Sequence, residues 1–171
     1  MPNGPTHDFI TIVSGAALAP AALQMNLPDM VPANAFVLLG SYLASGLLFS
    51  PDLDLRSSPY RRWRGMRWVW IPYQRMVPHR SWVSHSFLFG PLIRVVYFAV
   101  VLSLLTLTGL ALLNLLVPVD QSGVMLGIIT AISSWLTLHP WTTFYAAVGF
   151  VLGGAAHTVA DLVSTSIKRR F

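Results

Sequence analysis

The feature that most constrains this chain is a series of long apolar stretches with very little charge inside them. They cover residues 9–27, 35–49, 86–117, 124–138 and 141–163. A helix of about 20 apolar residues crosses the hydrocarbon core of a bilayer. Charged residues make up 10% of the chain and its mean hydropathy is +0.62, whereas a soluble domain has about 25% charged residues. We therefore expect an all-α fold, a polytopic membrane helical bundle.

The sequence predicts about four transmembrane helices in a single membrane-embedded domain over residues 1–171. The expected spans are residues 9–27, 34–50, 90–117 and 141–164, with a cytoplasmic loop over residues 51–85. Residues 124–138 are expected to be re-entrant or interfacial, because a fifth crossing would separate the C-terminal basic residues from the basic loop. Small residues between Gly40 and Gly46 favour close helix packing in lipid.

Basic residues are concentrated in two segments. Seven of the eleven lie between Arg56 and Arg80, and three more are residues 168–170. For a basic loop between apolar spans, the positive-inside rule is a better explanation than nucleic-acid binding. We therefore expect both segments to face the cytoplasm at a bacterial inner membrane, with the lipid bilayer as partner and no nucleic acid.

The basic loop also carries aromatic residues. Trp63, Met66 and Trp70 fall at helical spacing, which predicts a short amphipathic helix on the anionic leaflet. The alternative is an aromatic belt beside a plain basic loop. Arg94 stands apart from both basic segments, and we expect it to extend to the interface.

Histidine and aspartate are gathered in four short motifs: Thr6-His7-Asp8, Pro51-Asp52-Leu53-Asp54, residues 79–86 with His79 and His85, and residues 157–161 with His157 and Asp161. In the four-span arrangement, all four lie at the cytoplasmic side. The chain has no cysteine, so a metal would be held by imidazole and carboxylate groups. His157 and Asp161 share one helix face, at a depth where an unpaired carboxylate is costly.

Each motif also has a purely structural interpretation. Asp161 could pair with Arg94 or Arg80, and the Asp52 and Asp54 pair could cap the helix that follows. His79 alone would suit a loop, and His139, expected on the opposite side, is interpreted as structural. The convergence of the four motifs on one side favours a metal site.

In combination these motifs resemble the YdjM-type family of inner-membrane metal-dependent hydrolases, and residues 60–85 are still more similar to cyanobacterial uncharacterised metal-binding membrane proteins. The resemblance covers essentially the whole chain. It departs from the family at Leu55, where a histidine is frequent. It implies metal ligation by His7, Asp52, Asp54, His79, His85, His157 and Asp161. Seven side chains leave room for one or two ions, or for residues that orient the ligands. Zn, Mn or Fe(II) would suit them.

The resemblance implies a metal-dependent hydrolase in which the metal activates bound water. Asp8 or Asp54 would act as general base, and Arg80 or Arg56 would hold a phosphate oxygen. The interfacial location favours a lipid or phosphoester substrate. The alternative is a non-catalytic membrane scaffold or assembly factor held together by metal. A metal transporter is less favoured, because transporter sites lie near the bilayer midplane.

The predicted topology can be tested with reporter fusions. Fusions at residue 120 and at the C-terminus should report opposite sides of the membrane, because the basic segments orient the spans. Reporters on the same side would contradict the four-span arrangement.

Overall fold

The computed structural model describes residues 4–78, 81 and 86–168, and within these residues it contains helices and no β-strand. The long helices are α1 (Gly4–Gln24), α2 (Pro32–Leu47), α6 (Phe89–Asn114), α7 (Gln121–Leu138) and α8 (Pro140–Lys168). Between α2 and α6 lie the 3-10 helix η1 (Pro51–Asp54), α3 (Ser58–Arg62), the 3-10 helix η2 (Arg64–Trp70) and α4 (Ile71–Met76). The prediction of an all-helical fold is thus confirmed for the described residues.

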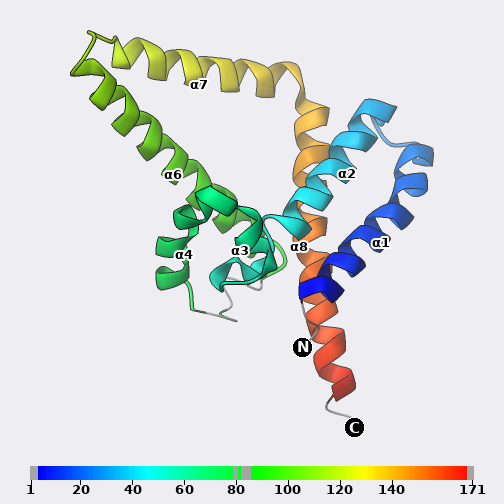
Figure 1. Ribbon diagram of the computed structural model, residues 1–171. Coiled ribbons are helices and arrows are strands. Elements are labelled where there is room, and N and C mark those ends of the chain that lie inside the picture. Colours follow the sequence, from blue (N-terminus) through cyan, green and yellow to red (C-terminus); the bar gives the residue numbers. More distant parts are fainter. Residues whose placement is uncertain (1–3, 79–80, 82–85, 169–171) are drawn as a thin grey trace.

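Helices α1, α2 and α8 form a bundle (Figure 1), in which α2 and α8 make the most extensive contact. A Cβ atom on Gly149 would lie 2.1 Å from the backbone oxygen of Leu38 and 2.3 Å from the Ser41 hydroxyl, and one on Gly153 would lie 2.1 Å from the backbone oxygen of Tyr42. Only glycine permits this approach. Because the contacts advance together along both helices, α2 and α8 run parallel. Of the small-residue stretch predicted to pack closely, Ser41 and Ser45 lie in this interface, whereas Gly46 faces Thr11 of α1.

Polar side chains also connect the helices of this bundle. The hydroxyls of Ser14 on α1 and Tyr42 on α2 are 2.6 Å apart, and Thr142 on α8 donates to the side-chain oxygen of Asn34 on α2 at 2.8 Å. Hydrogen bonds between helices satisfy polar groups that have little access to water. These hydrogen bonds fix the relative orientation of helices that are otherwise held together by close packing.

Helices α6 and α7 diverge from the bundle, and α7 runs across from the far end of α6 to the start of α8 (Figure 1). The apolar segments of both helices are exposed. Among the described residues, five helices are long and apolar enough to cross a membrane, whereas four spans were predicted. The additional helix is α7, which contains the stretch expected to be re-entrant or interfacial. It begins at Gln121 because Asp120 accepts a hydrogen bond from the Gly123 N–H. Its 18 residues make it about 27 Å long.

The segment between α2 and α6 packs around an aromatic cluster. Its buried members are Leu53, Tyr60, Trp70, Tyr73 and Val77. Trp63, Met66 and Trp70 were predicted to share one face of a helix, but they do not. Trp70 is fully buried and stacks on Phe98 at 5.8 Å, whereas Met66 is exposed. The reason is that residues 64–70 form a 3-10 helix, whose three residues per turn rotate Trp70 away from Met66.

The close contact between α2 and α8 gives a direct test. Gly153→Ala should lower the unfolding free energy by about 1–3 kcal/mol, the usual cost of overpacking, because its Cβ would overlap the Tyr42 carbonyl. Gly109→Ala on α6 is the matched control, since a Cβ there meets nothing within 4 Å and alanine favours a helix by about 1 kcal/mol. Thermal unfolding in detergent measures both, and an unchanged Tm for Gly153→Ala would contradict the packing described.

Candidate metal centre

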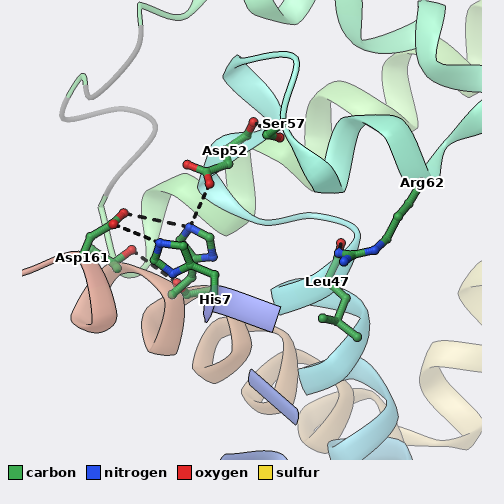
Figure 2. A network of polar contacts seen from close by, with 9 residues as sticks. His7, Leu47, Asp52, Ser57, Arg62 and Asp161 are labelled. Atoms are coloured by element: carbon green, nitrogen blue, oxygen red, sulfur yellow. Dashed lines mark hydrogen bonds and ion pairs between the residues drawn. The ribbon is translucent and has the colours of Figure 1, made fainter. Parts of the chain in front are cut away.

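Three separate segments bring two histidines and two aspartates together. His7 lies in the first turn of α1, Asp52 in η1, and His157 and Asp161 one turn apart on α8. Figure 2 shows the His7, Asp52 and Asp161 side chains converging from these elements, with dashed lines marking their contacts. The i, i+4 pair predicted on one helix face therefore meets both an N-terminal residue and the loop that follows α2.

The distances within this group suit one shared ion. His7 Nε2 lies 3.2 Å from Asp161 Oδ1, and His157 Nε2 lies 3.4 Å from Asp52 Oδ2 and 3.9 Å from Asp161 Oδ2. Ligand atoms of a tetrahedral zinc site lie about 2.0–2.2 Å from the ion, and so about 3.4 Å from one another. One ligand atom from each of His7, Asp52 and His157 falls within 4.8 Å of the other two.

Burial makes the charge of this arrangement costly unless it is balanced, either within the His–Asp pairs or by a bound cation. His7, His157 and Asp161 are all buried, with His157 only 2% exposed. The two imidazole rings stack at 3.9 Å with an interplanar angle of 14°. Among the described residues, His157 Nε2 lacks a hydrogen-bond partner although it faces two carboxylates. A buried nitrogen aimed at carboxylate oxygens without a hydrogen bond has the geometry of a metal ligand, so the residues fit a divalent ion.

The geometry of η1 decides where its side chains point. A 3-10 helix has three residues per turn, so Asp52, Leu53 and Asp54 project in three different directions. Asp52 faces His157, Leu53 enters the aromatic cluster, and Asp54 is buried at 4% exposure outside the group of ligand atoms. Backbone and side-chain hydrogen bonds fix the turn, including one of 2.6 Å from the Ser57 hydroxyl to the Asp52 carbonyl. The N-cap residue of α3 is Ser57 and neither of the two aspartates.

Several other predicted residues are placed elsewhere. The carboxylate of Asp8 forms an ion pair with Arg62, which also donates to the Leu47 carbonyl at 2.8 Å. Its role as general base stays a prediction, as does that of Asp54. Leu55, at the position where a histidine was expected from the family, is exposed. His79, Arg80 and His85 lie outside the described residues.

Arg94 is the residue whose role the sequence did not indicate. It was expected to extend to the interface, but its side chain is fully buried. Its guanidinium group interacts electrostatically with Tyr73, Asp54 and Asp52. An isolated arginine that begins a long apolar stretch could have indicated an internal counter-ion, because two aspartates precede it at the same end of the bundle.

The fold and this cluster define a helical protein with a candidate metal site. The chain belongs to the family described as uncharacterized metal-binding protein (DUF2227), whose model matches residues 2–171. It is also similar to an uncharacterized protein of Aquifex aeolicus (strain VF5), with 28% identity over 129 residues that cover 75% of this chain and 89% of the relative. No solved structure matches the chain. The family confirms the expected resemblance to uncharacterised metal-binding proteins.

The candidate ligands of this centre can be tested by substitution. His157→Ala removes a ligand atom, so it should weaken divalent-metal affinity more than the roughly 10–100-fold typical of an outer residue. Asp161→Asn keeps the side-chain shape and should weaken that affinity by about 10–100-fold, because Asp161 holds the two imidazole rings. His139→Ala is the control, because His139 caps the C-terminus of α7, outside the cluster. Metal content of the purified chain by mass spectrometry measures all three. Full retention of metal by both cluster variants would contradict the site.

Proposed function

We propose that this chain is a membrane-embedded metal-dependent hydrolase that acts on a phosphoester, such as a lipid-linked one, at the cytoplasmic face of the inner membrane. The observation that carries the proposal is the cluster of His7, Asp52 and His157, with Asp161 beside both imidazoles. Catalytic zinc sites commonly use three protein ligands and leave a fourth position for water. When bound, the ion would supply water activation and polarise a substrate oxygen.

The exposure of the cluster supports access from one direction. The side chain of Asp52 is 21% exposed, whereas those of His7 and His157 are 5% and 2% exposed. A substrate would therefore approach past Asp52, while α1 and α8 exclude water from the other side. Asp161, close to both imidazoles, would hold the two rings in place. The resemblance to YdjM-type hydrolases agrees with this assignment.

Membrane embedding rests on the apolar helices. Five described helices have the length and composition to cross a bilayer, and their outward side chains are largely apolar, including Leu104 and Ile129 at 58% exposure each. Arginines of α3 and η2 lie in the segment that carries the Asp52 turn. With the positive-inside rule, this supports a cytoplasmic location of the centre.

A hydrolase reaction gives a sharp test. Purified chain loaded with Zn, Mn or Fe(II) should hydrolyse phosphomonoester or phosphodiester lipids, and a chelator should abolish turnover. Asp52→Asn should reduce turnover by at least about 10–100-fold. Asp120→Asn should leave it unchanged, because Asp120 is at the N-terminus of α7 and bonds only Ser122 and Gly123 among the described contacts.

The competing function is a non-catalytic scaffold or assembly factor, in which the ion only joins α1, η1 and α8. X-ray absorption spectra of the metal-loaded chain separate the two. A coordinated water beside the protein ligands would support the hydrolase. A shell filled by protein ligands, together with no turnover of phosphoesters, would contradict it.

A further inference from the structure

Arg94 lies deep in the protein, close to the metal centre. It belongs to the second turn of α6 and is 0% exposed. A Cβ atom on Gly154 would lie 3.5 Å from its terminal nitrogen Nη2, so the guanidinium group reaches α8 one turn before His157. A buried charge of this kind is stable only when opposite charges and polar groups surround it.

The groups around Arg94 supply that negative charge. Its guanidinium interacts electrostatically with the carboxylates of Asp54 and Asp52 and with the Tyr73 hydroxyl. Burial raises the pKa of Tyr73, although Arg94 acts in the opposite direction. Tyr73 is therefore neutral at ordinary pH and contributes a dipole but no charge. Among the described residues, the negatively charged groups that interact with Arg94 are the two carboxylates of η1.

The two carboxylates of η1 serve different partners. Asp52 faces His157 at 3.4 Å and belongs to the group that can hold an ion. Among the described residues, Asp54 does not belong to that group; it is buried, and its electrostatic interaction with Arg94 is stronger than that of Asp52. The 3-10 geometry described above produces this separation, because Leu53 between them is anchored in the aromatic cluster.

We propose that Arg94 takes the place of a second metal ion, so that the centre holds one divalent cation and Asp54 is the counter-ion of Arg94 instead of a metal ligand. This rests on the proposed metal centre. A carboxylate that binds a metal or pairs with a guanidinium group carries a negative charge, so Asp52, Asp54 and Asp161 present three negative charges. Among the described residues, one divalent ion and one guanidinium group balance them. A second divalent ion would add charge that these residues do not compensate.

The first test is the number of ions per chain. Purified full-length protein, saturated with Zn²⁺ and freed of excess metal, should contain one ion per chain by mass spectrometry and protein quantitation. Two ions per chain would overturn this proposal and leave the hydrolase assignment standing. A chain that binds no ion would overturn both.

The second test removes the charge of Arg94 alone and then the charges of Arg94 and Asp54 together. Arg94→Met should lower the Tm of the metal-loaded protein, because Asp54 then loses its counter-ion, and Arg94→Lys should lower it less. Adding Asp54→Asn to Arg94→Met should restore part of the lost Tm and keep one ion per chain, because neither charge is then buried alone. If Asp54 ligates the metal, Asp54→Asn will instead remove metal in either background, and the proposal fails.

Arg62→Met is the matched control for the arginine substitution. Arg62 forms an ion pair with Asp8 at a partly exposed position, so its loss should change the Tm by less than Arg94→Met does. Adding Asp54→Asn to Arg62→Met should give no recovery. Recovery in that background equal to the recovery with Arg94→Met would show that Asp54 is not specific to Arg94.

Discussion

The close contact of α2 with α8 is the interaction on which the candidate metal centre depends. Gly149 and Gly153 bring the backbone of α8 against Leu38 and Tyr42 of α2. The next turn of α8 carries His157, and the turn after α2 carries Asp52. A register shift of one helical turn would move these side chains about 5.4 Å apart along the helix axes, and the cluster would be lost. Glycines one and two turns before His157 therefore determine whether the candidate ligands meet.

The parallel arrangement of α2 and α8 also bears on the path of the chain through a bilayer. Helix α2 ends at the metal centre, so α8 begins at the far end of the bundle. Helix α6 begins beside the centre, where Arg94 approaches Gly154, and runs away from it (Figure 1). Both ends of α7 then lie at the far end. With the proposed membrane embedding, α7 would lie along the membrane surface opposite the candidate metal centre, although its composition would also suit a membrane-spanning helix.

Part of the candidate site could be predicted from local sequence. The i, i+4 spacing of His157 and Asp161 and the absence of cysteine are local properties, and they pointed to an imidazole and carboxylate site. His7 is a weak candidate by itself, because a histidine near a terminus has no local signal, and it was included through the convergence of the four motifs and the family resemblance. The different directions of the Asp52 and Asp54 side chains could not be predicted, because they depend on a 3-10 turn that Leu53 and the aromatic cluster hold in place.

The burial of Arg94 and Trp70 was missed for a related reason. Arginine and tryptophan commonly lie at membrane interfaces, so both residues were expected there. The tertiary structure buries them instead. Trp70 packs against Phe98, and Arg94 is surrounded by the polar groups of α4 and η1. Such positions require knowledge of which helices pack together. The same limit applies to Asp8, whose partner Arg62 is 54 residues away in sequence.

The order of the ligands along the chain has a consequence for biosynthesis. His7 and Asp52 are synthesised early, but His157 and Asp161 belong to α8, which emerges last. The first two candidate ligands therefore lie in a partly assembled bundle until α8 docks on α2. Metal binding would then occur only after α8 has packed against α2. A chain arrested before α8 would expose the surface of α2 that contacts the glycines of α8, together with two candidate ligands that lack their α8 partners, to cellular quality control.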